Sequence, residues 1–218
     1  MKPKQFAVIG LGRFGTSIAQ SLYNMGHDVL AVDLAEERVN SIMKDVTHVV
    51  QLDSTNERAL RSLGLDNFDV VIVSIGQDVQ ASILTTLILK ELGCKNIVAK
   101  ARTELHGKVL SKIGANRVVY PEWDMGVRVA HNLASANILD YIELSDDYSI
   151  LEVKAPREMW GKTLQELDLR AKKGVSVLAI KQDAEVNVSP GARDRVEEGS
   201  IMVLVGRNED LKKIEERL

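Results

Sequence analysis

A glycine-rich segment near the N-terminus has the residue types and spacing needed to hold a phosphate group. Its glycines follow a GxGxxG pattern in the segment Gly10-Leu11-Gly12-Arg13-Phe14-Gly15. The first glycine permits a tight turn, the second lets backbone amides approach phosphate oxygens, and the third lets a helix pack closely on a strand. Asp33 follows about twenty residues later, where a carboxylate can accept hydrogen bonds from ribose hydroxyls. We expect a nucleotide-binding loop, and a plain set of turn glycines is the alternative.

One position inside this loop carries a charge. Arg13 stands where such loops often have a small or apolar residue. A guanidinium there can bridge phosphate oxygens, including those of a nucleotide on a neighbouring subunit. A solvent-exposed arginine at the start of a helix is the alternative.

The loop is embedded in a regular alternation of strands and helices over the first two-thirds of the chain. β-branched runs predict strands at 5–9, 28–32, 48–52, 69–74, 96–99 and 117–120. Amphipathic patterns predict helices near 14–25, 36–44, 56–63, 79–92 and 103–113. Strands separated by helices of this length indicate right-handed βαβ units and a Rossmann-like, doubly wound parallel sheet. The low aromatic content, 4%, suits the aliphatic core of such a fold.

Residues at the carboxyl ends of these strands are further candidates for the site. Ligands of open α/β sheets bind outside those ends, so side chains that follow the strands share one rim. The candidates after the third, fourth and fifth strands are Asp53, Ser54, Ile75, Gly76, Gln77, Lys100, Ala101 and Arg102. Each of them could also be an ordinary loop residue.

The pattern changes after about residue 120. A helix is predicted over 123–138, and its apolar spacing fits both packing on its own domain and crossing to a partner subunit. After a linker around 140–147, strands are predicted at 149–154, 175–182, 185–189 and 200–206, with helical segments near 163–168 and 208–217. We therefore divide the chain into a Rossmann domain (1–120), a helix region (121–139) and a small α+β domain (140–218). A domain this small favours dimerisation.

Composition excludes several function classes. The 28 basic and 31 acidic residues are mixed along the chain, so no basic block predicts a nucleic-acid partner. A single cysteine, Cys94, rules out an intramolecular disulfide and a CxxC site. No apolar run approaches the roughly 20 residues needed to cross a bilayer. We expect a soluble, cytoplasmic protein.

An NAD(H)-dependent oxidoreductase with a small dimerisation domain is the alternative function. Such an enzyme needs an acid–base group beside the nicotinamide. The four histidines, His27, His48, His106 and His131, all precede the small domain, and only His106 lies in a segment that follows a strand end. We therefore expect no enzymatic activity.

Several segments together resemble the RCK (KTN/TrkA) family, the cytosolic nucleotide-binding regulators of potassium channels and transporters, and in particular its Ktr-type potassium-uptake regulatory subunits. The resemblance extends over essentially the whole chain. It rests on FAVIGLGRFG (6–15), QASILTTL (80–87), VLSKIGA (109–115), PEWDMG (121–126), LDLRAK (167–172) and VSP (188–190).

The resemblance implies an octameric ring, assembled from dimers and docked on a membrane potassium transporter. ATP would favour the active ring and ADP the inactive one, with NAD(H) as a competing nucleotide. The predicted helix after residue 120 would be the crossover between subunits. The implied nucleotide site comprises Gly10, Gly12, Arg13, Phe14, Gly15, Asp33, Asp53, Ser54, Ile75, Gly76, Gln77, Lys100, Ala101, Arg102, His106 and Glu122. Glu122 would lie near the terminal phosphates and help to hold a divalent or sodium ion, while an ordinary helix-start glutamate is the alternative.

The small domain resembles the C-terminal RCK (TrkA-C) module, which implies a cyclic di-AMP site at a dimer interface. Arg170 would contact a phosphate, beside apolar walls and one polar position formed by Leu164, Val175, Val177, Pro190 and Ser176. The sequence departs from the usual pattern at Lys173, where an aromatic residue is common, and at Ser176, where an amide often occurs. A purely structural dimer domain is the alternative.

Overall fold

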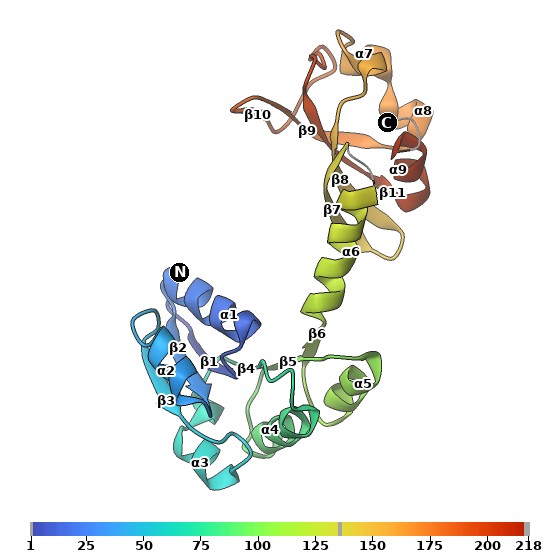
Figure 1. The fold of residues 1–218 in the computed structure, drawn as a ribbon. Helices are drawn as coiled ribbons and strands as arrows, with labels where there is room; N and C mark the ends of the chain where they lie inside the picture. The colour runs from blue at the N-terminus through green and yellow to red at the C-terminus, as the bar shows by residue number, and fades with distance from the viewer. Residues whose placement is uncertain (1, 135–136, 216–218) are drawn as a thin grey trace. The chain divides into compact units, whose positions relative to one another are not determined.

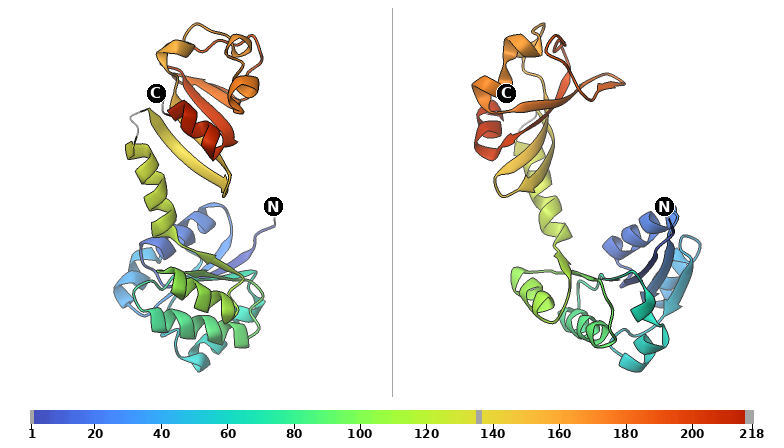
Figure 2. Two further views of the ribbon diagram at one scale, coloured as in Figure 1. Left: turned by 90° about the vertical axis from the view of Figure 1, so that its right-hand side faces the viewer. Right: turned by 180° about the vertical axis from the view of Figure 1, so that it is seen from behind.

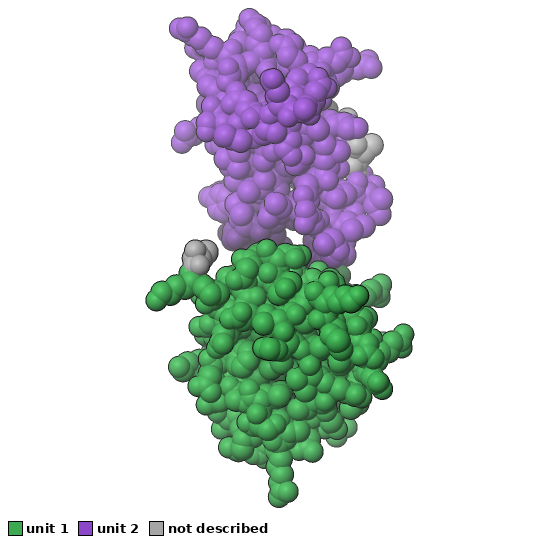
Figure 3. All heavy atoms as spheres, turned by 90° about the vertical axis from the view of Figure 1, so that its left-hand side faces the viewer, with its two compact units in different colours: residues 1–122 green, residues 123–218 purple. Residues whose placement is uncertain are grey.

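The chain forms two compact units. The computed structural model describes residues 2–134 and 137–215, and it separates residues 1–122 (unit 1) from residues 123–218 (unit 2), as Figure 3 shows. The boundary falls after the second residue of the helix that begins at Pro121. No helix within the described residues is long and apolar enough to span a membrane.

Unit 1 is a doubly wound parallel sheet, which confirms the fold class expected for this part of the chain (Figure 1). Its strand order is β3-β2-β1-β4-β5-β6. The strands are β1 (Gln5–Ile9), β2 (Asp28–Asp33), β3 (His48–Gln51), β4 (Val70–Val73), β5 (Ile97–Lys100) and β6 (Arg117–Val119). The helices are α1 (Arg13–Asn24), α2 (Glu36–Ile42), α3 (Glu57–Ser62), η1 (Leu65–Asn67), α4 (Val79–Glu91) and α5 (Glu104–Lys112).

Alternation along the strands gives unit 1 a core on each side of its sheet. Val8 packs with the apolar residues of α1 and α2, whereas its neighbours Ala7 and Ile9 pack with those of α3, α4 and α5. Successive side chains of a strand point to opposite faces, so a run buried on both faces must be apolar throughout. The helices accordingly lie on both faces of the sheet (Figure 2).

Unit 2 contains an antiparallel sheet of order β10-β9-β11-β8-β7. Its strands are β7 (Ile138–Ser145), β8 (Tyr148–Lys154), β9 (Ser176–Gln182), β10 (Glu185–Asn187) and β11 (Ile201–Arg207). Its helices are η2 (Arg157–Met159), α7 (Leu164–Leu167), α8 (Leu169–Lys173), α9 (Asn208–Glu215) and the part of α6 (Pro121–Ala134) that follows Glu122. The α+β class is confirmed, with a core formed around Leu151, Val175 and Met202.

The linker predicted around 140–147 is wrong, because these residues form most of β7 and the turn that leads into β8. Register runs from Ile138 opposite Val153 to Ser145 opposite Tyr148. Of the residues in β7 only Ile138 is buried, since the strand lies at the edge of the sheet. The half-buried Asp140 and the exposed Glu143 therefore make this stretch resemble a polar linker in the sequence.

The helix predicted over 123–138 is displaced at both ends. The described part of α6 begins at Pro121 and ends at Ala134, Ile138 already belongs to β7, and residues 135–136 lie outside the described residues. Within unit 2, Arg128 of α6 forms an ion pair with Asp140, and the ring of His131 stacks on that of Tyr141 at 3.9 Å between centroids. Residues 216 and 217 of the last predicted helix also lie outside the described residues, and the short helix α8 was not predicted.

Candidate nucleotide-binding site

A cavity of about 620 Å³ opens in unit 1 where the strands β1 to β5 end. Its size lies within the ordinary range for small-molecule sites. Of the residues predicted for the nucleotide site, all line the cavity except Gly15, Ala101 and His106. Other side chains and backbone that line it are Ile9, Leu34, Arg38, Leu52, Thr55, Ser74, Asp78 and Ala81.

The glycine loop forms one wall, and its three glycines have different roles. Gly10 has φ +94°, and its amide donates to the carbonyl of Val32 at 2.8 Å. Gly12 precedes α1 as its N-cap, and no described atom lies within 4 Å of a Cβ added there. A Cβ on Gly15 would lie 1.9 Å from the carbonyl oxygen of Gly10. Gly15 therefore allows the helix to pack, whereas Gly12 leaves open space where amides of the helix N-terminus can meet an anion.

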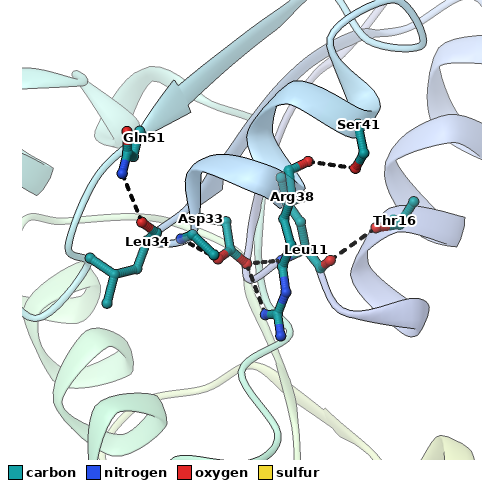
Figure 4. Close-up of polar contacts among 8 residues, drawn as sticks. Leu11, Thr16, Asp33, Leu34, Arg38, Ser41 and Gln51 are labelled. Carbon is teal, nitrogen blue, oxygen red and sulfur yellow. Dashed lines mark hydrogen bonds and ion pairs between the residues drawn. The ribbon is translucent and has the colours of Figure 1, made fainter.

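Asp33, at the end of β2, joins the glycine loop to the start of α2 (Figure 4). Its Oδ2 accepts a hydrogen bond from the Leu11 amide at 2.5 Å, and its Oδ1 accepts one from the Ala35 amide at 2.8 Å. The guanidinium of Arg38 lies 3.4 Å from Oδ2. Asp33 is only 7% exposed, and its position is the one at which Rossmann domains bind an adenosine ribose.

Positive charge gathers on the other side of the loop. Lys100, at the end of β5, has a side chain that is 11% exposed, and its Nζ lies 2.5 Å from Oε1 of Glu122 and 5.6 Å from the centre of the Phe14 ring. Gly76 makes room for it, since a Cβ there would lie 3.2 Å from Nζ. The hydrogen bond from Lys100 lowers the pKa of Glu122. Lys100 is thus a largely desolvated cation whose protein partner, Glu122, is mostly exposed, at 71%.

The cations Arg13 and Arg102 also line the cavity, and the charge of Arg13 acts on Glu122. Arg13 is exposed at the start of α1. Charge-assisted hydrogen bonds from arginine and lysine to phosphate oxygens are stronger than neutral ones. The residues at this end can therefore bind a di- or triphosphate chain.

The loop after β3 supplies polar groups at a third part of the cavity. Oδ1 of Asp53 accepts hydrogen bonds from the amide and the hydroxyl of Thr55, at 2.9 and 2.7 Å, and these bonds lower the pKa of the Asp53 carboxyl. The hydroxyl of Ser54 is buried against that of Thr85 at 2.8 Å. Leu34 and Leu52 add apolar lining. This combination of apolar surface and fixed acceptors suits a purine base.

Besides Gly15, two predicted residues do not line the cavity, and both of them are buried next to residues that do. Ala101 is 1% exposed and lies between Lys100 and Arg102, both of which line the cavity. His106 is 4% exposed, and its Nδ1 accepts from the Arg102 amide at 3.3 Å. Burial lowers the pKa of His106, which keeps the imidazole neutral at pH 7.

Arg38 is the main site residue that the sequence reasoning missed. It lies in the first turn of α2, five positions after Asp33. The signal was available, because the first turn of a helix that follows a strand end lies beside the rim on which ligands bind.

The residues predicted for cyclic di-AMP lie in unit 2 and have different degrees of burial. Val175 is fully buried in the core, and Leu164 and Val177 pack against that core. Ser176 and Pro190 are partly buried, whereas Arg170 is exposed on α8.

Glu122 was also predicted to help to hold an ion. Within the described part of the chain, no three His, Cys, Asp or Glu side chains are grouped closely enough to hold a metal. Glu122 can supply a carboxylate, and any further ligands would have to come from phosphate oxygens or from another copy of the chain.

Comparison with known proteins assigns a family domain to each unit. The TrkA-N domain matches residues 6–121, and the TrkA-C domain matches residues 148–218. The Ktr system potassium uptake proteins C and A of Bacillus subtilis are 51% and 50% identical to this chain, over 99% of it and 97% of each relative. The Ktr system potassium uptake protein A of Vibrio alginolyticus is 39% identical, over 95% of the chain and 94% of the relative.

Solved structures agree on the fold. The GsuK channel matches with a TM-score of 0.70 and 19% identity, over 100% of this chain and 39% of that chain. The same channel bound to NAD matches with a TM-score of 0.69 and 20% identity, over 100% and 39%. Two family domains and near full-length relatives therefore show that the chain belongs to the RCK (KTN/TrkA) family, among its Ktr-type potassium uptake proteins.

Proposed function

We propose that the chain is the nucleotide-sensing gating subunit of a Ktr/Trk-type potassium uptake system, located in the cytoplasm at the inner face of the membrane. It forms a ring that activates the membrane subunit when ATP is bound and inactivates it when ADP is bound, with NAD(H) as a competing nucleotide. The observation that carries this proposal is the phosphate end of the cavity, where Arg13, Lys100 and Glu122 meet beside the glycine loop. The names of the near full-length relatives supply the transport system.

The mechanism requires ATP and ADP to differ in their affinity for two conformations, because a ligand shifts an equilibrium only through such a difference. The γ-phosphate of ATP can cause this difference in affinity, since it extends the anionic phosphate chain toward Lys100 and Arg13. Phosphate oxygens compete with Glu122 for the Nζ of Lys100. Glu122 is the second residue of α6, and the rest of that helix belongs to unit 2. When a phosphate oxygen replaces Glu122 as the partner of Lys100, the start of α6 therefore loses its contact with the nucleotide site.

Assembly into a ring needs two different self-contacts, and apolar side chains are exposed on both units. On α6, where no described residue is buried, Trp123 is 74% and Leu133 is 81% exposed. We propose that this helix crosses to a partner subunit and makes the dimer. On unit 1, Leu84 and Leu87 of α4 and Leu105 of α5 are exposed. We propose that a second contact between these surfaces joins dimers into an octamer. Exposed apolar patches often mark interfaces between subunits, and most oligomers are closed and symmetric.

The C-terminal unit is proposed to bind cyclic di-AMP. In support of this, Arg170 extends from α8 together with Lys172 and Lys173, so the helix offers several donors to a phosphate. Leu164 and Val177 can provide apolar contacts to the ligand, whereas Val175 is buried in the core of unit 2. Calorimetry with cyclic di-AMP, on the full chain and on Arg170→Gln, tests this, and equal binding by both proteins would exclude the assigned contact.

The gating proposal is tested by calorimetric titration of ATP and ADP, with light scattering to measure the size of the assembly. Arg13→Gln should lose roughly ten-fold or more of its ATP affinity, because a hydrogen bond to a charged group contributes about 1.5–3 kcal/mol, and it should lose less for ADP. Arg58→Gln is the matched control, since Arg58 is exposed on α3 and does not line the cavity. Equal ATP and ADP affinities in the unmodified protein, with a monomer in both, would refute the proposal.

A further inference from the structure

Arg38 lines the cavity from α2, and it also lines a second pocket with Gly12 and Arg13 beside the start of α1. Among the described residues that line the cavity, the other cations are Arg13 in the glycine loop and Lys100 and Arg102 at the end of β5. Arg38 instead extends from α2 and reaches Asp33, at the end of β2 (Figure 4). The arginine therefore lies at the ribose end of the proposed site.

The hydrogen-bonding capacity of Asp33 is incompletely used. An ionised carboxylate only accepts, with about four acceptor positions. The amides of Leu11 and Ala35 take one position on each oxygen, and Arg38 approaches Oδ2 at 3.4 Å, near the long limit for a hydrogen bond. At least one position on Oδ1 is left for a ligand, and the position shared with Arg38 is only weakly held.

Arg38 has the complementary capacity. A guanidinium carries five N–H donors and no acceptor. The Arg38 side chain is 51% exposed, and its only contact with a carboxylate among the described residues is the long one to Asp33. Its remaining donors are free to turn toward a ligand at the edge of the cavity that both residues line.

A ribose diol needs both kinds of partner, because each hydroxyl donates one proton and accepts through its oxygen. We propose that Arg38 is a second ribose-binding residue, whose guanidinium donates to the diol oxygens while Asp33 accepts their protons. The pair then selects adenine ribonucleotides over 2′-deoxyribonucleotides, and the inference rests on the adenine-nucleotide site proposed above. A 2′-deoxyribose lacks the 2′-hydroxyl, and it therefore lacks both a donor to Asp33 and an acceptor for Arg38.

The test is a calorimetric measurement of the Kd of ATP and of 2′-deoxy-ATP on the full chain. The unmodified protein should bind ATP about ten-fold more tightly than 2′-deoxy-ATP. Arg38→Gln should weaken ATP binding about ten-fold and 2′-deoxy-ATP binding less than about three-fold, so that the discrimination is largely lost. Arg38→Lys keeps the positive charge beside Asp33 without the planar fork, and it should give an intermediate discrimination. Arg58→Gln is the control for a general loss of charge.

Three results overturn the inference. An equal loss for both nucleotides in Arg38→Gln would show that Arg38 acts through charge or folding alone. Tighter ATP binding in Arg38→Gln would show that Arg38 competes with the ribose for Asp33. Unchanged Kd values for both nucleotides in Arg38→Gln would show that Arg38 does not contact the diol. Absence of any adenine-nucleotide binding by the unmodified protein is a distinct result, because it would remove the proposed function itself.

Discussion

Two glycines of the same loop should respond in opposite ways to an added methyl group. In Gly15→Ala, the new Cβ would lie 1.9 Å from the Gly10 carbonyl oxygen and 2.9 Å from Oγ of Ser74. The carbonyl would have to move by more than 1 Å to reach ordinary contact of about 3.4 Å. It is held by the turn at Gly10, whose φ is +94° and whose amide is bonded to Val32. Overpacking of this kind costs about 3 kcal/mol, which corresponds to a fall in Tm of roughly 10 °C for a unit of this size.

Gly12→Ala is the matched comparison. No described atom lies within 4 Å of the added Cβ, and the φ of −71° suits any residue. Its stability should fall by no more than about 1 kcal/mol, because alanine is a poorer N-cap than glycine, whereas ATP binding should weaken about ten-fold because the methyl group enters the space of the phosphates. Gly15→Ala lowers the stability of unit 1 directly.

The assay must report on unit 1 separately. Both tryptophans, Trp123 and Trp160, belong to unit 2, so fluorescence serves as the internal control. Hydrogen exchange of peptides from β1 and α1, followed by mass spectrometry, measures local stability in the full chain. Normal protection of these peptides in Gly15→Ala would refute the packing argument, and lost protection in Gly12→Ala would refute the separation of roles.

Three further predictions concern titratable groups. Arg128→Gln should raise the pKa of Asp140 toward its ordinary value of 3.8, since the hydrogen bond from Arg128 is the largest cause that lowers it, ahead of the Tyr141 amide and Lys181. The stability lost in that variant should be evident above about pH 4 and should vanish as the pH falls through the lowered pKa of the native protein, which denaturation at several pH values measures. Burial raises the pKa of the Cys94 thiol to about 11, so iodoacetamide at pH 7.5 should label it only after unfolding, as mass spectrometry will show. Glu122→Gln should tighten ATP binding about three-fold in metal-free buffer because Lys100 loses its competing partner; weaker binding by calorimetry would contradict this.

The sequence predicted unit 1 well because its patterns are strong there. Strands buried on both faces, such as β1 with Ala7, Val8 and Ile9, are apolar throughout, and helices of regular length separate them. The edge strand β7 lacks that signal, since Asp140 and Glu143 interrupt its apolar residues and Ile138 alone is buried. An edge strand interrupted in this way is therefore read as a linker when only hydrophobic periodicity is used.

The candidate site was predictable to the level of which strand ends contribute. The position of a residue in the chain does not determine which way its side chain points. Ala101 was therefore included, although it is buried between two residues that line the cavity. His106 was included through the family resemblance, and its buried ring accepts a hydrogen bond from the Arg102 amide. Arg38 was omitted because only residues that directly follow a strand were taken as candidates, whereas Arg38 reaches Asp33 from the first turn of α2.

Under the proposed function, the number of phosphates on the bound nucleotide determines the shape of the assembly. Small-angle X-ray scattering of the full chain, with ATP, with ADP and without nucleotide, tests it most directly. We expect one ring-sized assembly with distinct scattering profiles in ATP and ADP, and we expect Arg13→Gln to abolish this difference. Identical profiles in the two nucleotides, at concentrations where calorimetry shows both to be bound, would contradict it.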